Sequence, residues 1–386
     1  GIDVTVIQKG DHLLNTVDSD IASFVHTNLR TKGINILLNA NVKSIEKNIV
    51  ITDCKEIPAD MVIVSVGVSP ENTLAKDAGL DLGVKGAIAV SDNMQTSDED
   101  IYAVGDAVEV ENFILKNKAV ITLAGPANKQ GRIAADNICG INSTYKGTQG
   151  ASVIKLFDMT VASTGMTETQ LKLSNIAYEK VILSPLSHAG YYPGATVMTL
   201  KVIFEKETYK ILGAQAVGYE GVEKRIDVIA TAIFAGLTAD KLKDLELSYA
   251  PPYSSAKDPV NMAGFIIENM KNGIVGQFYY EDIPLLQKRD DVTLLDTRTV
   301  YEYMRGHAEG FINIPVDELR ERLAELDKSK PVYVMCQSGL RSYLATRILM
   351  QNGFDAYNFA GGYRLYGTMY YDEVVSKNAY DCGMEK

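Results

Sequence analysis

The feature that most constrains the fold is a strand, a short loop and a helix that meet at one cysteine. Residues 330–336, KPVYVMC, form an apolar run that is typical of a buried strand. Residues 342–353, SYLATRILMQNG, have helical spacing, with Leu344, Ile348 and Leu349 predicted to face inward and Gly353 predicted to end the helix. Cys336 is therefore expected where the strand gives way to the helix of an α/β domain.

This position favours a reactive thiolate. Loop amides and the positive end of the helix are expected to converge on the sulfur of Cys336, and Arg341 adds a full positive charge. The thiolate is the nucleophilic form of cysteine, and the same surroundings would stabilise the terminal sulfur of a persulfide. The intervening loop supplies candidate substrate contacts, namely Gln337, Ser338, Gly339 and Leu340.

The remaining cysteines and the overall charge exclude several classes of protein. We interpret Cys54, Cys139 and Cys382 as small buried hydrophobes or inert surface thiols. The sequence has no C-x-x-C or H-E-x-x-H, so no metal is expected, and so few cysteines in 386 residues indicate a reducing, cytoplasmic setting. A net charge of −11 argues against nucleic acid as a partner, and no apolar run is long enough to cross a membrane.

The N-terminal segment is typical of the second half of a nucleotide-binding α/β unit. Residues 3–8 form an apolar strand, residues 19–33 have helical spacing with Gly33 as a stop, and residues 34–68 indicate several more strands. The G-x-G-x-x-G turn that opens such a unit is absent, and the chain starts without a methionine. We therefore expect a truncated nucleotide-binding unit that lacks its first half.

The middle of the chain has strong local signals. Residues 152–166 alternate like a strand, residues 196–218 predict a hairpin, and Thr167 with Gln170 predicts a capping box. A helix is predicted over 221–236, ended by Gly236, with one apolar face formed by Val222, Ile226, Ile229 and Ile233. The domain boundaries we predict are 1–70, 71–150, 151–273, a linker at 274–278, 279–375, and a tail at 376–386.

Residues 278–371 resemble the rhodanese family of sulfurtransferases. The resemblance depends on LLDTR with Asp296 and Arg298, GHAEGFINIP at 306–315, CQSGLRS at 336–342, and AGGY with Gly361 and Gly362. It implies that Cys336 accepts a sulfane sulfur and passes it on. Ala308 and Phe311 depart slightly from the usual pattern, outside the cysteine loop.

A phosphatase on the same fold is the alternative for this domain. Related phosphatases use a loop one residue longer, whereas four residues separate Cys336 from Arg341. A smaller ring of amides suits one sulfur better than three phosphate oxygens. We therefore predict sulfur transfer from thiosulfate or a persulfide and no phosphatase activity.

Residues 1 to about 273 resemble the pyridine-nucleotide disulfide reductases, and within them the group of CoA-disulfide reductases and NADH oxidases. The motifs are VGVSPEN, TSDEDIYAVGDA, AGPANKQGR, GAQAVGYEGVEKRIDVIATAI and YAPPYSSAKDPVNMAG. In that family an FAD-binding lobe with a redox-active cysteine comes first, and no cysteine of this chain can be assigned to that role. The resemblance implies a multidomain α/β and α+β fold: partial FAD- and NAD(P)-binding domains, an α+β dimerisation domain and an α/β rhodanese domain.

The same resemblance implies cofactor contacts. Gly105 and Asp106 should bind the ribitol and phosphate region of FAD, although Asp106 taken alone could equally cap a helix. A strand over 97–107 should line that cofactor, through Ile101, Tyr102 and Ala107. Gly67 and Pro70 should lie near the nicotinamide. Gln8 stands where an acidic residue would select NADH, and Lys9 follows it, so NADH and NADPH both stay open.

Tyr191 and Tyr249 match the active-site tyrosines of the family, where a phenol can donate a proton to a leaving thiolate. Amphipathic packing is the plainer role of any tyrosine. Contacts to CoA are implied for Lys257 and for Asn128 or Lys129, although Lys129 could equally be a solvated surface lysine. A homodimer is implied, in which the tyrosines of one subunit complete the flavin site of the other.

The function predicted from these resemblances is that of a fragment of a flavin-dependent NAD(P)H reductase of CoA disulfide, CoA persulfide or polysulfide. Its cofactors would be FAD and NADH or NADPH, and Cys336 would relay sulfane sulfur from a separate donor. One alternative is a stand-alone sulfurtransferase on a flavoprotein-derived dimer scaffold. Another is a water-forming NADH oxidase with an accessory sulfur domain.

Overall fold

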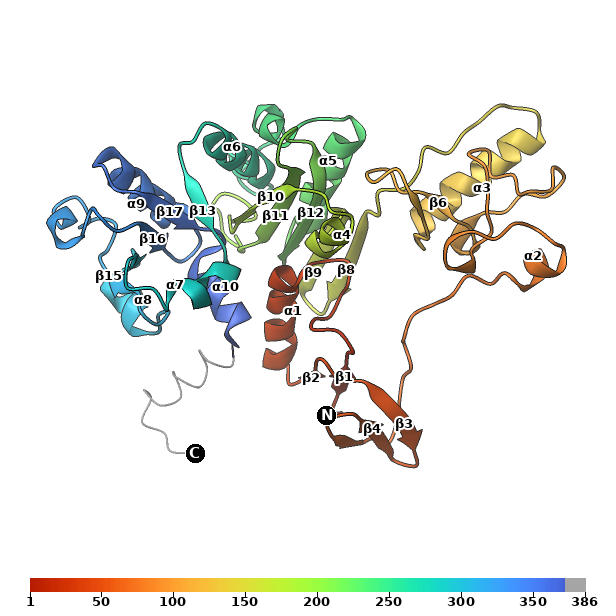
Figure 1. The fold of residues 1–386 in the computed structure, drawn as a ribbon, viewed down its shortest axis with the longest axis horizontal. Coiled ribbons are helices and arrows are strands. Elements are labelled where there is room, and N and C mark those ends of the chain that lie inside the picture. The colour runs from red at the N-terminus through yellow and green to blue at the C-terminus, as the bar shows by residue number, and fades with distance from the viewer. Residues whose placement is uncertain (372–386) are drawn as a thin grey trace.

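The centre of the molecule is an antiparallel sheet of five strands in the order β10-β11-β12-β9-β8 (Figure 1). The computed structural model describes residues 1–371. The strands of this sheet are β8 (Ser152–Leu156), β9 (Met159–Gly165), β10 (Tyr178–Leu183), β11 (Thr199–Glu205) and β12 (Ile211–Gly218). The β11–β12 hairpin predicted over 196–218 is confirmed. The single strand predicted over 152–166 is instead the β8–β9 hairpin, which turns at Phe157 with φ 57°.

Helices cover both faces of this sheet. They are α4 (Glu168–Leu173), α5 (Val222–Phe234), the 3₁₀ helix η3 (Ala239–Asp244) and α6 (Pro259–Lys271). Along β12, Ala214 and Ala216 pack with α5, whereas Val217 packs with the N-terminal helix α1 (Ser19–Thr31), because alternate side chains of a strand point to opposite faces. Both faces of β12 are therefore buried, whereas the edge strand β8 is largely exposed.

The local signals of this region are confirmed. Thr167 accepts a hydrogen bond from the Gln170 backbone N–H, and the Gln170 side chain accepts one from the Thr167 N–H, as a capping box requires. The predicted apolar face of α5 is buried throughout, and Gly236 follows the helix with φ 74°. Gly33 follows α1 in the same way, with φ 80°.

The C-terminal domain contains a parallel sheet in the order β13-β17-β16-β14-β15. Its strands are β13 (Gly276–Phe278), β14 (Thr293–Asp296), β15 (Ile312–Asn313), β16 (Val332–Met335) and β17 (Ala356–Phe359). Its helices are η4 (Tyr280–Asp282), α7 (Ile283–Leu286), α8 (Val300–Met304), η5 (Leu323–Glu325), α9 (Leu340–Gln351) and α10 (Gly362–Met369). Parallel strands joined by helices confirm the predicted α/β class.

One side chain of α9 differs from the prediction. Leu344 was expected to face inward, but 48% of it is exposed. Ala345, Ile348 and Leu349 form the buried face, and Leu344 lies one position to the side of it. Gly353 ends the helix as predicted, with φ 83°.

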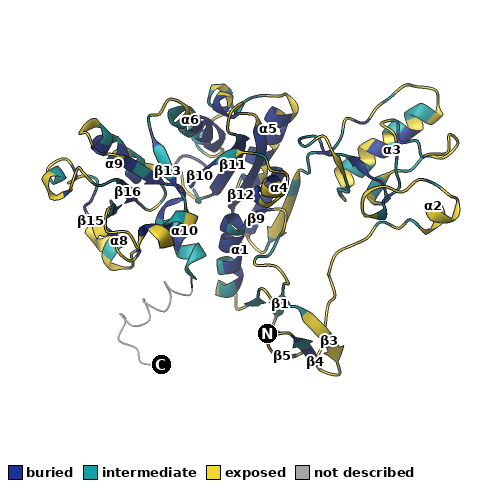
Figure 2. Ribbon diagram, viewed as in Figure 1, coloured by how far each residue is buried: buried dark blue, intermediate teal, exposed yellow. Residues whose placement is uncertain are grey.

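The N-terminal part forms two small sheets beside α1. Strands β1 (Thr5–Ile7) and β2 (Asn35–Leu37) pair in parallel, and a second, antiparallel sheet contains β3 (Val42–Glu46), β4 (Ile49–Thr52) and β5 (Glu56–Pro58). The prediction of strands as far as residue 68 is wrong beyond β5. Residues 59–72 form no strand, and the chain is largely exposed there (Figure 2). Val66 and Val68 are 91% and 82% exposed. An apolar run forms a stable strand only beside another strand, and among the described residues none pairs with this one.

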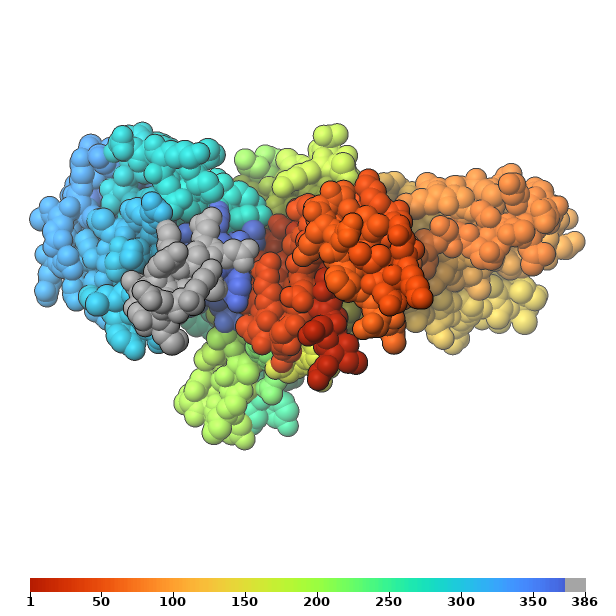
Figure 3. Space-filling model, turned by 90° about the horizontal axis from the view of Figure 1, so that it is seen from below, coloured from red at the N-terminus to blue at the C-terminus, as the bar shows by residue number. Residues whose placement is uncertain are grey.

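Residues 71–150 form a separate lobe at one end of the molecule (Figure 3). Its elements are α2 (Thr73–Asp77), η1 (Val84–Gly86), η2 (Gly105–Ala107), β6 (Val110–Glu111), β7 (Lys118–Ala119) and α3 (Ala124–Ile138). The strand expected over 97–107 is absent from this lobe. That segment makes one isolated bridge, from Tyr102 to Gln95, and ends in the 3₁₀ turn η2.

The central and C-terminal domains share an apolar core. Ile21, Val25 and Ile182 pack in one cluster with Ala360 and Leu365 of the C-terminal domain. The segment 274–278, predicted as a linker, contains the buried Val275 and strand β13. The two domains are therefore packed against each other rather than joined by a free tether.

Two further observations concern the limits of the chain. None of the helices in residues 1–371 is both long and apolar enough to cross a membrane. Cys382, the predicted tail 376–386 and the end of the domain predicted at 279–375 lie outside the described residues.

Candidate functional site

Cys336 lies between the end of β16 and the start of α9, where the sequence predicts it. Its side chain is 1% exposed. The sulfur accepts hydrogen bonds from the Gly339 N–H at 3.1 Å and from the Ser342 hydroxyl at 3.2 Å. Gly339 has φ 99°, a left-handed conformation that suits glycine and turns its amide toward the sulfur. Two donors directed at one sulfur favour an anion there.

Residues of the AGGY motif and the residue after it hold the cysteine loop in place through backbone hydrogen bonds. The Cys336 carbonyl accepts a hydrogen bond from the Tyr363 N–H at 2.7 Å, and the Gln337 carbonyl accepts one from the Arg364 N–H at 3.0 Å. Gly362 has φ 66°, and a Cβ there would lie 2.7 Å from the Gln337 backbone. A glycine is therefore required at 362, because the two backbones approach too closely for a side chain.

The charge of Arg341 differs from the expectation. Its guanidinium donates two hydrogen bonds of 2.7 Å to the carboxylate of Glu302 on α8. The positive charge predicted to act on the sulfur is therefore largely neutralised by an ion pair. Neither Glu302 nor Ser342 is among the functional residues predicted from the sequence. Ser342 is part of the CQSGLRS motif, whereas the sequence carried no signal for the contact of Glu302.

The other motif residues of this domain have a supporting role. Arg298 forms a buried, two-pronged ion pair with Asp296, with an Nη2–Oδ2 distance of 2.7 Å. Its guanidinium lies 3.7 Å from the centroid of the Tyr363 ring. Asp296 ends β14, so this pair fixes the strand end beside the cysteine loop. Gln337 and Leu340 are exposed, and Ser338 is half-buried, so all three stay accessible at the mouth of the loop.

The structure brings Tyr191 and Tyr249 together. Their hydroxyl oxygens lie 2.9 Å apart, and both side chains are exposed, at 77% and 47%. The hydrogen bond to Tyr191 raises the pKa of Tyr249 above its ordinary value. Tyr249 therefore keeps its proton near neutral pH, as a proton donor must.

A buried arginine joins the two segments that carry these tyrosines. Arg225 of α5 is 1% exposed and donates hydrogen bonds to the Ser187 carbonyl at 2.8 Å and to the Ser254 hydroxyl at 3.2 Å. Its Nη2 also lies 3.0 Å from the Asp258 carboxylate. The Ala189 N–H donates to the Ser254 carbonyl at 3.0 Å. Arg225 is not among the functional residues predicted from the sequence.

The predicted flavin contacts cluster in the lobe of residues 71–150. Asp106 is exposed inside η2, whose N-cap position is Val104, so Asp106 is not the cap of this turn. Gly105 donates to the Gln130 side chain at 2.7 Å, which fixes η2 against α3. The helix α3 begins without a side-chain cap, and a Cβ on Gly125 would meet no atom within 4 Å. An exposed carboxylate beside an open, uncapped helix start suits the hydroxyls and phosphates of a dinucleotide.

The other residues predicted to contact a cofactor or CoA are not brought together into one site by this structure. Gly67 and Pro70 lie in the segment 59–72, which forms no strand, and Gln8 directly follows β1, where its N–H donates to the Leu37 carbonyl at 2.8 Å. Asn128 and Lys129 are exposed on α3, as is Lys257 before α6. Ile101 and Tyr102 precede η2, and Ala107 ends it.

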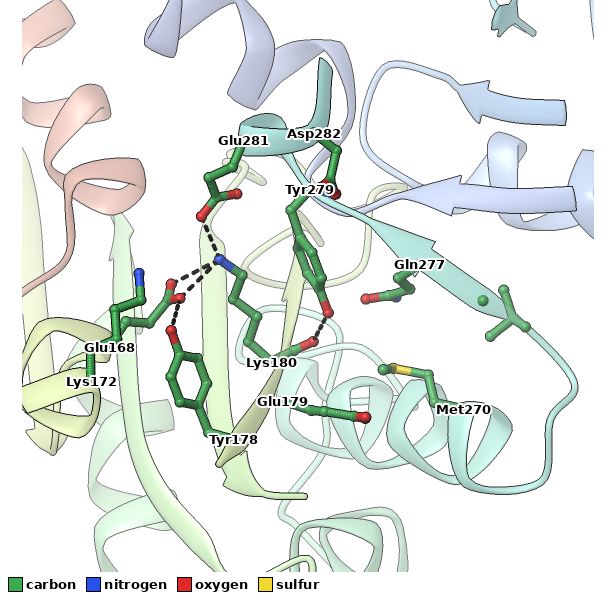
Figure 4. A pocket seen from close by; sticks show the side chains of 12 residues that line it. Glu168, Lys172, Tyr178, Glu179, Lys180, Met270, Gln277, Tyr279, Glu281 and Asp282 are labelled. Atoms are coloured by element: carbon green, nitrogen blue, oxygen red, sulfur yellow. Dashed lines mark hydrogen bonds and ion pairs between the residues drawn. The ribbon is translucent and has the colours of Figure 1, made fainter. Parts of the chain in front are cut away.

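A cleft at the junction of the central and C-terminal domains is built from ion pairs (Figure 4). The Lys180 ammonium lies 2.9 Å from Glu168 and 2.9 Å from Glu281, and the Tyr279 hydroxyl donates to the Lys180 carbonyl at 2.7 Å. None of the predicted catalytic side chains lines this cleft. The cleft is therefore part of the domain junction, because its charged side chains pair across it.

Deeper in the same junction, three carboxylates surround one buried lysine. Asp18, Asp20 and Glu168 offer oxygens within 4.8 Å of one another, an arrangement that could hold a metal ion. The Lys201 ammonium already lies among them, at 2.9, 2.7 and 2.5 Å respectively. Because an ammonium group fills the space between the three carboxylates, we interpret this cluster as a buried structural ion-pair network.

Three known protein families match three consecutive parts of the chain. The family described as pyridine nucleotide-disulphide oxidoreductase matches residues 1–131, and its dimerisation domain matches residues 151–259. A rhodanese-like domain matches residues 281–368.

Individual relatives agree with these matches. A coenzyme A disulfide reductase of Staphylococcus epidermidis is 34% identical over 69% of this chain, which spans 60% of the length of that relative. The structure of reduced CoADR-RHD of Bacillus anthracis is 46% identical with a TM-score of 0.93, over 97% of this chain and 68% of that one. An NAD-dependent persulfide reductase from A. fulgidus is 39% identical with a TM-score of 0.89, over 95% of this chain and 67% of that one.

Proposed function

Since the chain belongs to the pyridine nucleotide-disulphide oxidoreductases and carries a rhodanese-like domain, we propose that it acts in NAD(P)H-dependent reduction of CoA disulfide, CoA persulfide or polysulfide, with sulfur transfer at Cys336. The observation that carries the proposal is the pair of hydrogen-bond donors on the Cys336 sulfur. A reducing cytoplasm, which keeps this thiol free, suits the chemistry.

The lobe of residues 71–150 has the chemistry to hold a dinucleotide. Asp106 would accept hydrogen bonds from sugar-alcohol hydroxyls, and the open start of α3 would face a phosphate. Gly67 and Pro70 would lie toward the nicotinamide, and Gln8 toward its ribose. FAD and NAD(P)H, when bound, supply the electrons that cleave a sulfur–sulfur bond.

The tyrosine pair would donate a proton to the leaving thiolate. Tyr249 holds its proton through the hydrogen bond with Tyr191, and both phenols are accessible. A thiolate released beside them can take the proton from a phenol hydroxyl. Lys257, with Asn128 or Lys129, would contact the phosphates of CoA. A homodimer, in which each subunit presents its tyrosines to the other, is consistent with the match of residues 151–259 to a dimerisation domain.

Sulfur transfer at Cys336 needs no bound cofactor. The Cys336 thiolate attacks the outer sulfur of a donor, the donor's sulfur–sulfur bond breaks, and the former partner leaves as a thiolate or as sulfite. The persulfide on Cys336 is then held by the Gly339 N–H and the Ser342 hydroxyl. A second thiolate removes the outer sulfur and restores the enzyme.

The test is loading of the protein with sulfur. Incubation with a persulfide donor should add the mass of one sulfur atom to the Cys336 peptide, and cyanide should discharge it as thiocyanate. Cys336→Ser should abolish both signals. Ser342→Ala should slow transfer roughly tenfold, because it removes a hydrogen bond to a charged group, whereas Ser329→Ala on the domain surface should not. Loading that survives in Cys336→Ser would contradict the proposal.

A separate test addresses the reductase. Added FAD should lose fluorescence on binding, and Asp106→Ala should weaken that binding more than Asp100→Ala in the same exposed loop. Equal effects of the two substitutions would remove Asp106 from the proposed site.

A stand-alone sulfurtransferase is the second candidate, and one observation favours it. The residues that contact or support the Cys336 sulfur all lie in the C-terminal domain of this chain. Sulfur loading without NAD(P)H-dependent release of sulfide from polysulfide would favour this candidate over the reductase. NADH consumption with oxygen as the acceptor would instead indicate the water-forming oxidase.

A further inference from the structure

The ion pair between Arg341 and Glu302 lies at the mouth of the cysteine loop. Arg341 is the second residue of α9, and Glu302 lies in α8. Both side chains are 31% exposed, and two hydrogen bonds of 2.7 Å join them. A two-pronged contact of this kind fixes the orientation of the guanidinium as well as its charge.

Glu302 is held in place independently of Arg341. Its Oε2 accepts hydrogen bonds from the Thr299 N–H and the Thr299 hydroxyl, each at 2.9 Å. The Glu302 N–H donates back to the Thr299 hydroxyl at 3.2 Å, which completes a capping box at the start of α8. The hydrogen bonds from Arg341 lower the pKa of Glu302 to about 2, so the carboxylate is charged at any physiological pH.

The loop therefore offers an anionic substrate little net positive charge. The Arg341 charge is matched by Glu302, and the nearby Arg298 is matched by Asp296. The remaining donors to the sulfur, the Gly339 N–H and the Ser342 hydroxyl, are neutral. A thiolate at Cys336 would give the group an excess of negative charge, which repels a dianion.

The same two helices expose apolar side chains beside the ion pair. On α9 these are Leu340 and Leu344, at 59% and 48% exposure. On α8, Tyr301 is next to Glu302 in the chain and is 70% exposed, whereas the exposed Val300 and Met304 lie two positions from Glu302 and point to another side of the helix. The mouth of the loop thus combines apolar surface with a neutralised cation.

We propose that Glu302 makes the Cys336 loop select an organic persulfide, in which the groups next to the reacting sulfurs are uncharged, over the thiosulfate dianion. This inference rests on the proposed sulfurtransferase function. With a persulfide, Cys336–S⁻ attacks the outer sulfur of R–S–SH, and the products are Cys336–S–SH and R–S⁻. With thiosulfate the same attack must expel sulfite, a dianion, past the carboxylate of Glu302. Glu302 is a specificity-determining residue that acts through Arg341.

The test compares two donors in Glu302→Gln. Glutamine retains the capping box, so the fold of α8 should persist. The probes are thiosulfate and the persulfide of N-acetylcysteamine, a small neutral thiol. Loss of the carboxylate charge should raise kcat/KM for thiosulfate roughly tenfold through the freed Arg341. The value for the neutral persulfide should change by less than about twofold.

Two further variants serve as controls. Glu302→Asp keeps the charge and should keep the preference for the persulfide. Glu325→Gln breaks a similar two-pronged pair, with Arg322 on the domain surface, and should leave both rates unchanged.

Different results would overturn the inference about donor specificity and the proposed sulfurtransferase function. If the wild-type protein uses thiosulfate as well as the persulfide, or if Glu302→Gln changes both rates alike, the inference is overturned and sulfur transfer stands. If no donor loads Cys336 in the wild-type protein, the proposed function itself fails.

Discussion

The hydroxyl oxygens of Tyr191 and Tyr249 lie 2.9 Å apart, although 58 positions separate the two residues in the sequence. The hydrogen bond to Tyr191 raises the pKa of Tyr249. In Tyr191→Phe that bond is lost, and the pKa of Tyr249 should fall toward the ordinary value of tyrosine. NMR titration of ¹³C-labelled tyrosine measures this directly. Tyr253→Phe, which removes a neighbouring exposed phenol, should leave the Tyr249 titration unchanged, and a shift there would assign the effect to the loop as a whole.

Arg225 should be essential to the stability of the segments that hold this pair. Arg225→Met leaves the buried Asp258 carboxylate without its cation and removes the hydrogen bond to the Ser187 carbonyl. We expect a loss of about 3–5 kcal/mol in the free energy of unfolding, measured with urea. Arg132→Met is the matched control, because its side chain is 84% exposed, and it should cost less than about 0.5 kcal/mol. A cost for Arg225→Met no larger than that of the control would show that the arginine does not stabilise the two segments.

Acid should weaken the domain junction through Glu168. Burial alone would raise the pKa of this carboxyl, but Lys201 and Lys180 outweigh burial and lower it from 4.5 to about 2. Because the folded-state pKa is depressed, the contribution of Glu168 to stability is fully present above pH 4.5. It is lost as the pH falls toward 2.

Glu168→Gln should therefore be less stable than the wild-type protein at pH 7, and the difference should shrink between pH 4.5 and 2. Urea unfolding at a series of pH values measures the difference. Glu99→Gln, at an exposed position, should follow the wild-type curve throughout. A difference for Glu168→Gln that stays constant with pH would contradict the assigned role of the charge.

The shared core predicts that the central and C-terminal domains unfold together. Leu365 of α10 is fully buried against α1 and Ile182, so Leu365→Ala should cost about 2–5 kcal/mol. Calorimetry should show one transition for both domains, shifted to lower temperature in the variant. Leu285→Ala, at 67% exposure, should shift it little. Two separate transitions, with only one of them shifted, would indicate independent domains.

This shared core also affects how the proposed relay of sulfur from Cys336 to the proposed reductase site can be tested. Cutting the chain near residue 274 would expose Ile182 and Leu365 to water, so a loss of activity could follow from unfolding alone. Substitutions at Cys336 in the intact chain separate the two activities without that damage.

Much of the local structure could be predicted from the sequence. The strand and helix around Cys336, the capping box at Thr167 and the glycine stops at Gly33 and Gly236 all follow from the signals of a few neighbouring residues. Hydrophobic periodicity, side-chain caps and the left-handed backbone of glycine act over one or two turns of chain, so a local pattern specifies them.

Contacts between distant residues were decided by the tertiary structure. The pairing of Arg341 with Glu302 depends on how α8 and α9 pack, and the link from Arg225 to Ser187 depends on the fold of the central domain. The apolar residues 61–68 satisfy the pattern of a strand, yet form none, because a strand also needs a neighbour for its backbone hydrogen bonds. The sequence alone determined that Cys336 stands between a strand and a helix, and the fold determined which charges surround its sulfur, because electrostatic interactions depend on distance in space and not on separation along the chain.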